Sequence, residues 1–156
     1  GPLDGSSLRS VFETDAHIRS ADRATELHAR AMAGWVAGDP PAQRLFLFGG
    51  PGTLPGFAPA SFVGDRFALA DVQVSRSVLG PWIRLRALAA AGWATIGDAV
   101  APATWPATPT DGIRASAGVG VGLVYDILRI DLVRPLDGPG GWTTVLSVTP
   151  WLLDIL

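Results

Sequence analysis

The chain contains no cysteine and no lysine, and only 17% of its 156 residues are charged. The absence of cysteine excludes disulfides and thiolate metal sites. All 12 basic residues are arginine, and the formal net charge is −2. This charge excludes the global basic field that is typical of nucleic-acid-binding proteins, so no nucleic acid is expected as a partner.

Long apolar runs are also lacking, although 48% of the residues are hydrophobic. The longest candidates, Ala87–Gly97 and Ala115–Tyr125, are roughly half as long as a helix that crosses a bilayer. The composition is too apolar for a disordered chain. It leaves two interpretations, a β-domain with an unusually apolar surface or part of a transmembrane β-barrel.

Polar and apolar residues alternate along most of the chain, which is the pattern of β-strands. Most of the predicted strands run for about 10 to 13 residues, enough for a tilted strand to cross a bilayer, whereas strands of soluble proteins average about 5 to 6. An alternative strand count adds a further short strand at Leu45–Phe48. The predicted strands are Leu8–Ser20, Ala24–Ala37, Arg66–Arg76, Trp82–Thr95, Ile113–Tyr125, Ile127–Arg134 and Trp142–Leu152. Their length favours an antiparallel transmembrane β-barrel.

One side of the predicted strands carries most of the charges, and we expect this side to face the lumen. Acids and bases there nearly balance, which favours a salt-bridged structural network over an ion-selective pore. His17 and His28 have no obvious third ligand, so we interpret them as lumen residues rather than a metal site. The predicted lumen network is Glu13, Asp15, His17, Arg19, Glu26, His28, Arg30, Asp71, Gln73, Arg84, Arg86, Arg114, Arg129 and Asp131.

Most tryptophans lie near the ends of predicted strands, as in the aromatic girdles of membrane barrels. Trp82 and Trp93 are 11 residues apart on one strand. That separation corresponds to roughly 28 Å of depth at a tilt near 40°. The alternative is that the tryptophans cap a soluble core. The predicted girdle is Trp35, Trp82, Trp93, Trp142 and Trp151.

Long and short connections alternate between the predicted strands, with a long extracellular loop at 38–65. We assign residues 8–156 to one barrel domain and residues 1–7 to a tag or a trimmed segment. Seven strands is an odd number, whereas bacterial single-chain barrels have an even number. We therefore expect about seven or eight strands per chain, completed by a second copy in a homodimer or by the missing half of a larger barrel.

Several segments occur in an order that is similar to a known family. Residues 49–65 read GGPGTLPGFAPASFVGD, and FALADVQVSR and LGPWIRLRALAAAGWA follow. Two further segments read GVGVGLVYDILRIDLVRP and GWTTVLSV. Together they resemble the C-terminal barrel half of the bacterial surface-antigen family, the BamA/TamA-type outer-membrane-protein-85 superfamily. The resemblance implies a location in the bacterial outer membrane and a 16-stranded barrel that inserts or translocates proteins.

The resemblance also implies that the long loop folds back into the lumen, where an arginine at its tip pairs with acids on the next two strands. Pro55 stands at the arginine position, and Gln73 and Ala90 stand at the acidic positions. One buried charge left alone would cost several kcal/mol, so the joint loss of all three is physically consistent. The family loop motif is Leu54, Pro55, Gly56 and Phe57. We therefore expect a barrel unit with a structural, pore or assembly role and not an active insertase.

No pattern in the sequence points to catalysis. The segment GGPGTLPG lacks the lysine of a phosphate-binding loop, and GVGVG lies within a strand instead of opening a helix. We expect no enzyme, no cofactor and membrane lipid as the main partner. The alternatives are a soluble β-sandwich binding module and a barrel fragment of a larger multidomain outer-membrane protein.

The inward glycines Gly118, Gly120 and Gly122 are expected to leave room for backbone or for the loop.

Overall fold

The computed structural model describes residues 7–38, 42–97, 106–138 and 140–148. These residues form an all-β structure with one short 3-10 helix, η1 (Ala42–Arg44). Within these ranges, no helix is long and apolar enough to cross a bilayer. The strands are β1 (Ser7–Arg19), β2 (Thr25–Gly38), β3 (Phe46–Phe48), β4 (Phe62–Gly64), β5 (Arg66–Leu79), β6 (Ile83–Thr95), β7 (Arg114–Leu123), β8 (Leu128–Pro135) and β9 (Thr143–Val148).

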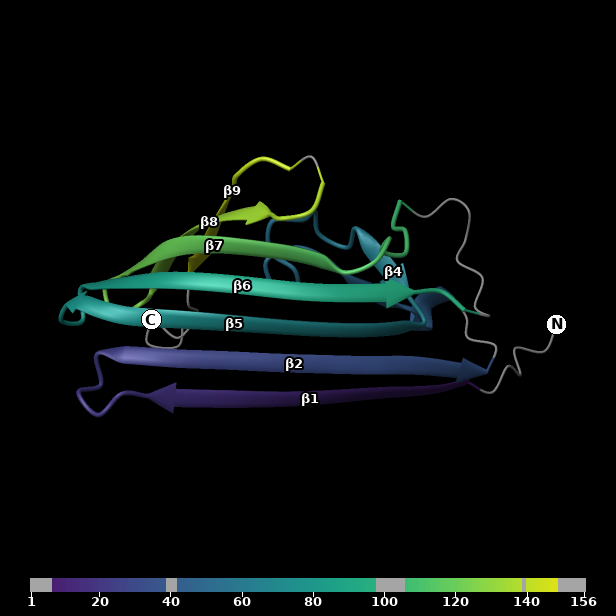
Figure 1. Ribbon diagram of the computed structural model, residues 1–156, viewed down its shortest axis with the longest axis horizontal. Coiled ribbons are helices and arrows are strands. Elements are labelled where there is room, and N and C mark those ends of the chain that lie inside the picture. The colour runs from purple at the N-terminus through teal and green to yellow at the C-terminus, as the bar shows by residue number, and fades with distance from the viewer. Residues whose placement is uncertain (1–6, 39–41, 98–105, 139, 149–156) are drawn as a thin grey trace, which may run out of the picture.

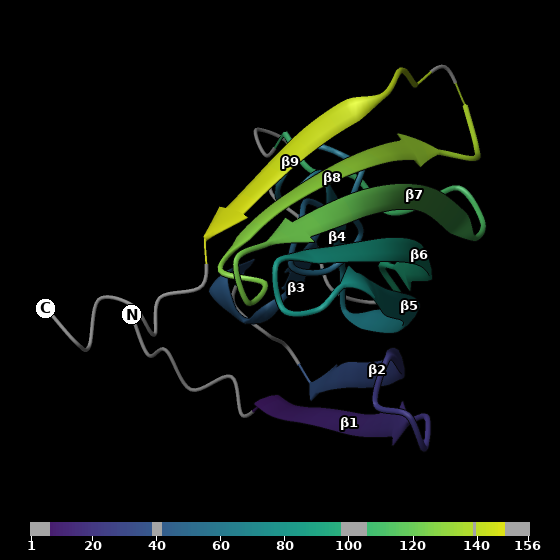
Figure 2. The same ribbon diagram turned by 90° about the vertical axis from the view of Figure 1, so that its left-hand side faces the viewer.

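The main feature is a seven-stranded antiparallel sheet in the order β1-β2-β5-β6-β7-β8-β9. The sheet bends into an arc whose two edges are β1 and β9 (Figures 1 and 2). The prediction of an all-β antiparallel fold is confirmed. The sheet does not close into a barrel, because β1 and β9 each pair with only one strand in the described part of the chain.

Each of the seven predicted strands corresponds to a strand of this sheet. The strand expected to end at Arg76 continues to Leu79, and the strand expected to reach Tyr125 ends at Leu123. Three successive residues after Leu123 have positive φ, a left-handed conformation that ends a strand and begins the turn to β8. Leu45–Phe48 contains β3, which pairs with β4 in a separate two-stranded sheet. Residues 149–152 of the last predicted strand lie outside the described residues.

The strand register places the two kinds of side chain on opposite faces. Arg30 lies opposite Asp71, and Gly120 lies opposite Asp131. Because successive residues of a strand point to opposite faces, this register gathers the charged rows on the concave face and the apolar rows on the convex face. In β9, Val145 lies opposite Asp131 and therefore faces inward.

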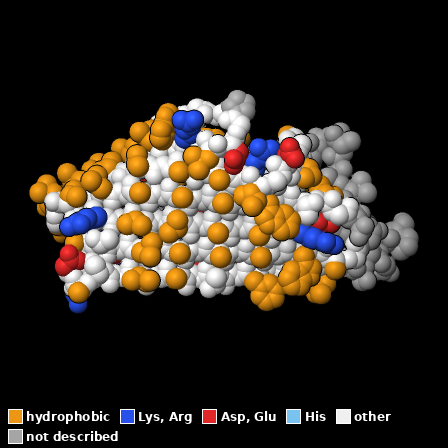
Figure 3. Space-filling model, viewed as in Figure 1, with side chains coloured by type: hydrophobic (Ala, Val, Ile, Leu, Met, Phe, Trp, Pro, Cys, Tyr) orange, Lys and Arg blue, Asp and Glu red, His pale blue; other side chains and the backbone are white. Residues whose placement is uncertain are grey.

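The convex face is apolar and open. The exposed fractions of Phe12, Leu85 and Leu146 on this face are 62%, 52% and 66%. Figure 3 shows hydrophobic side chains spread across the face, with charged side chains near its ends. The two-stranded sheet of β3 and β4 lies on the opposite, concave side (Figure 2). Within the described ranges, the convex face therefore lacks the second layer that a β-sandwich would place there.

Candidate functional site on the concave face

The long connection between β2 and β5 folds back onto the concave face (Figure 2). The Phe46 and Phe48 rings of β3 lie 4.5 Å and 6.4 Å from the ring of Phe67 on β5, measured between centroids. Leu54 has no exposed surface and belongs to the same apolar cluster. Burial of these side chains holds the loop against the sheet.

The loop contacts both sides of the arc. Near β1, Nη1 of Arg44 donates to the Ser7 carbonyl oxygen at 2.8 Å. Near β8, Gly56 approaches the backbone so closely that a Cβ there would lie 3.2 Å from the Pro135 nitrogen. Its φ of 92° also favours glycine. The long connection therefore packs inside the arc and spans it from β1 to β8, and the predicted loop motif lies at its β8 side.

Arg30 joins the long loop to the seven-stranded sheet, which is called the wall from here on. Its Nε donates to Oδ2 of Asp71 at 2.8 Å, and its Nη2 donates to the Gly52 carbonyl oxygen at 3.0 Å. The side chains of Arg30 and Asp71 are about three-quarters buried, with exposed fractions of 25% and 24%. A partly buried, charge-assisted contact of this kind is stronger than a surface ion pair.

The three positions at which the family resemblance implies charges lie around one cavity. A cavity of about 310 Å³ between the loop and the wall is lined by Pro55, Gln73 and Ala90. Arg86 and Asp131 also line it. Nη2 of Arg86 donates to Oε1 of Gln73, so the cation at this place comes from the wall instead of the loop.

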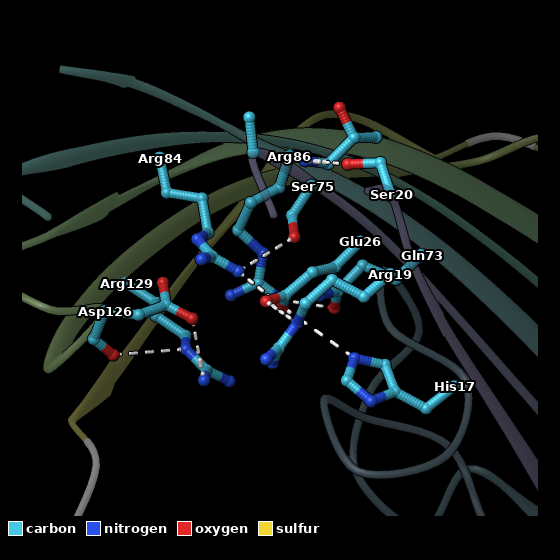
Figure 4. Close-up of polar contacts among 12 residues, drawn as sticks. His17, Arg19, Ser20, Glu26, Gln73, Ser75, Arg84, Arg86, Asp126 and Arg129 are labelled. Atoms are coloured by element: carbon cyan, nitrogen blue, oxygen red, sulfur yellow. Dashed lines mark hydrogen bonds and ion pairs between the residues drawn. The ribbon is translucent and has the colours of Figure 1, made fainter. Parts of the chain in front are cut away.

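A second polar cluster surrounds Glu26 nearer the short turns (Figure 4). Its carboxylate accepts a hydrogen bond from Nη1 of Arg84 at 2.6 Å and forms an ion pair with Arg19, whose Nε lies 2.9 Å from Oε1. Nε2 of His17 lies 3.8 Å away. Arg84 also donates to the Ser75 hydroxyl at 3.3 Å. One carboxylate therefore links three strands, β1, β2 and β6.

The predicted network does not form as a single unit. His28 pairs with Asp15 at 3.3 Å, separately from the Glu26 cluster. Within the described ranges, Glu13 and Arg114 form no ion pair. The sequence analysis missed Asp126, which pairs with Arg129 at 2.8 Å. The sequence does contain a signal for this ion pair, because Asp126 and Arg129 are three residues apart across a tight turn.

The three inward glycines of β7 make room for the neighbouring strand. A Cβ on Gly120 would lie 1.9 Å from Oδ1 of Asp131, and one on Gly122 would lie 1.9 Å from Oδ1 of Asp126. A Cβ on Gly118 would lie 2.5 Å from the Leu132 carbonyl oxygen. The atoms nearest these three positions therefore belong mainly to β8 and to the turn before it. The long loop approaches the sheet at another place, beside Pro135.

Aromatic rings mark both ends of the strands. At the end that carries the long connections, the Trp35 ring stacks on Phe12 at 5.5 Å. At the opposite end, the Trp82 and Tyr125 rings lie 6.0 Å apart. Trp93 and Trp142 are both exposed at the end of the long connections, and Trp151 lies outside the described residues. Phe12 and Tyr125 extend the predicted set because the analysis considered tryptophan alone.

The described ranges contain no group of three or more histidine, aspartate and glutamate side chains arranged to hold a metal ion. No protein-family model matches the chain. No curated protein sequence matches it either. The features of the described ranges that bear on function are the two faces of the sheet and the contacts that hold the loop on the concave side.

Proposed function

We propose that the chain is one wall of a bacterial outer-membrane β-barrel. It is related to the C-terminal barrel half of the surface-antigen superfamily, with a structural, pore or assembly role and no catalytic activity. The observation that carries the proposal is the opposition of an exposed apolar convex face and an ionic concave face. In a membrane barrel, the first face contacts lipid and the second encloses the lumen.

The height of the apolar band supports this proposal. On β5, the outward-facing charged residues are Arg66, the first residue of the strand, and Arg76, three residues before its end. Ala68, Ala70, Val72 and Val74 face outward between them. Ten residues at a tilt near 40° span about 25 Å, which is the height of the lipid-facing band in outer-membrane barrels.

The connections give the wall an orientation. Short turns join β1 to β2, β5 to β6 and β7 to β8, whereas the connections at the other end are longer. Outer-membrane barrels place short turns in the periplasm and long loops outside the cell. The loop on the concave face thus enters the lumen from the extracellular side.

The cavity around Pro55 supports a role other than insertase. Pro55, Gln73 and Ala90 supply no charge where the family resemblance implies an arginine and two acids. The loop is held instead by Arg30 and by its apolar side chains. We infer that the loop is a permanent brace of the lumen.

The directions of the two edge strands restrict the number and direction of the further strands that close the proposed barrel. Neighbouring strands are antiparallel throughout, so β1 and β9 run in the same direction. Two copies arranged about the barrel axis would meet only at parallel seams between β1 and β9. Antiparallel closure needs an odd number of further strands. We therefore favour the missing part of a larger barrel over a homodimer.

Two neighbouring residues of β6 test the proposal. Ala89 faces outward and Leu88 faces the lumen, because Leu88 lies opposite Gln73. We expect Ala89→Arg to impair insertion into lipid vesicles by about 2–4 kcal/mol, whereas Leu88→Arg inserts nearly normally. Insertion is measured by heat-modifiable gel mobility and protease protection. Equal insertion of both variants, or recovery of the chain in the aqueous fraction without detergent, would contradict the proposal and favour a soluble module.

A further inference from the structure

The outer side of β1 is an open strand edge. β1 runs for 13 residues and pairs only with β2 in the described chain. Every residue from Val11 to Arg19 is exposed. Unpaired N–H and C=O groups cannot remain in hydrocarbon, so a wall that lies in a membrane needs another strand along this edge.

A second copy of the chain is a poor fit to this edge. The other open edge, β9, has six residues within the described ranges. It would run parallel to β1 in a ring of copies, and parallel pairing is slightly less stable. Its inward residues are Thr143, Val145 and Ser147, none of which is charged. The edge of β1 therefore calls for a different strand.

The inward row of β1 is acidic at its centre. Glu13 lies opposite Met32 of β2 and forms no ion pair within the described ranges. Asp15 lies opposite Arg30, but that guanidinium binds Asp71 and Gly52. The Asp15 side chain is 53% exposed, and its ion-pair partner within the described ranges is the His28 imidazole at 3.3 Å.

The cations at the ends of the same row already have contacts. The guanidinium carbon of Arg9 lies 4.4 Å from the centroid of the Phe46 ring. Arg19 and His17 both face Glu26. The centre of the row is therefore the place at which a neighbouring strand meets two acids that no arginine of the described ranges pairs with.

We propose that β1 pairs with an antiparallel strand that carries two basic side chains, two residues apart, on its inward face opposite Glu13 and Asp15. Opposite charges directly across a strand pair stabilise the pairing, and like charges weaken it. The outward residues of that strand are apolar, because they continue the face of Leu8, Phe12 and Ile18. The inference rests on the proposed membrane location, since lipid is what makes the open edge costly.

Synthetic ten-residue strands provide the test. Three peptides share an alternating sequence with outward valine and inward threonine, and they differ only at two inward positions, which are both Arg, both Gln or both Glu. Each is added to the refolded chain in detergent micelles. Binding and amide hydrogen exchange in β1 are measured. We expect the Arg peptide to protect β1 and to bind about tenfold more tightly than the Glu peptide, with the Gln peptide between them.

Charge reversal gives the decisive control. In the double variant Glu13→Arg and Asp15→Arg, the order of the peptides should invert. Reversal of an exposed acid far from the edge, Asp111→Arg between β6 and β7, should leave the order unchanged. Equal binding of all three peptides, protection of β9 alone, or a dimer with protected β1 amides before any peptide is added would overturn the inference.

The same samples separate this inference from the proposed function. Peptide selectivity is measured in detergent, whereas insertion is measured in vesicles with Ala89→Arg and Leu88→Arg. Insertion without peptide selectivity contradicts only the inference about β1. Peptide selectivity without insertion contradicts the membrane location and leaves the edge as a site for a basic strand in another setting.

Discussion

Arg86 and Asp131 form an ion pair across the strand that lies between them, with Nε 3.6 Å from Oδ1. Both residues lie opposite Gly120 of β7, one on β6 and the other on β8. The absence of a side chain at Gly120 lets the two charges approach each other. Both side chains are buried, with exposed fractions of 5% and 10%, so each charge depends on the other to offset the cost of its burial.

Gly120→Ala should therefore destabilise the wall by about 1–3 kcal/mol, because its Cβ would lie 1.9 Å from Oδ1 of Asp131. The measurement is urea unfolding in detergent, followed by tryptophan fluorescence. The control is Gly141→Ala, where a Cβ would meet nothing within 4 Å. The effect should shrink when Asp131 is also replaced by Ala. Equal stability of the two glycine variants would contradict the account of this ion pair.

Arg30→Met should release the loop from the wall. The variant loses the bonds to Asp71 and Gly52 and leaves a partly buried carboxylate without its cation, which costs about 1–3 kcal/mol. We expect faster proteolysis between Gly49 and Pro59. Arg134→Met, at an exposed arginine on the convex side, should leave the cleavage rate unchanged. If both variants resist protease like the parent chain, the apolar contacts alone hold the loop.

Glu26→Gln should weaken the turn end of the wall. The change removes the negative charge that Arg19, Arg84 and His17 share, so three cationic or polar groups lose their common partner. A loss of about 1–3 kcal/mol is expected from the unfolding free energy. Glu13→Gln removes an acid on the inward face of the neighbouring strand β1 that has no ion pair in the described chain, and it should change stability by less than about 0.5 kcal/mol. Similar losses from both changes would argue against the clustering at Glu26.

The tryptophans should report two depths in a bilayer. Trp35 and Trp93 lie near the end with the long connections, and Trp82 lies near the opposite end. Single-tryptophan variants in vesicles, quenched by lipids brominated at known depths, should place all three rings at an interface and none at the midplane. Selective quenching from the outer leaflet should affect Trp35 and Trp93 but not Trp82. Strongest quenching at the midplane would be inconsistent with the girdle.

Acid should weaken the turn between β1 and β2. The Ser20 hydroxyl and the Ala24 N–H both donate to the Asp22 carboxylate, and they hold its pKa below the ordinary value of 3.8. A lowered pKa means that this contribution is fully present above pH 3.8 and is lost as the pH falls through the lowered value. An NMR titration of Asp22 should give a midpoint below 3.8, and Asp22→Asn should remove the transition. A midpoint at or above 3.8 would contradict the assignment.

The strands and their faces were predictable because alternation is a local property of the chain. The rows of Ala and Val on β5 and β6 are enough to fix which side is apolar. Strand ends were less predictable, since the end of β7 depends on the backbone of Val124, Tyr125 and Asp126, three residue types that rarely adopt positive φ in succession.

The contacts of the concave face were harder to predict than its composition. Alternation places Glu26 and Arg84 on one face, but only the register and the bend of the sheet bring them together. The atoms that fill the space beside Gly120 depend on the neighbouring strand, which the sequence of β7 does not specify. The partners of the two edge strands were not predictable for the same reason, because alternation within β1 and β9 does not specify what pairs with their open sides.

The loop touches the wall at two distant places, at Ser7 on β1 through Arg44 and at Pro135 on β8 through Gly56. These two places belong to strands that are separated by four others in the sheet. Contacts within a single segment thus fix how sharply the seven-stranded sheet bends. In the proposed barrel, the curvature that a neighbouring strand has to match is therefore determined by this loop.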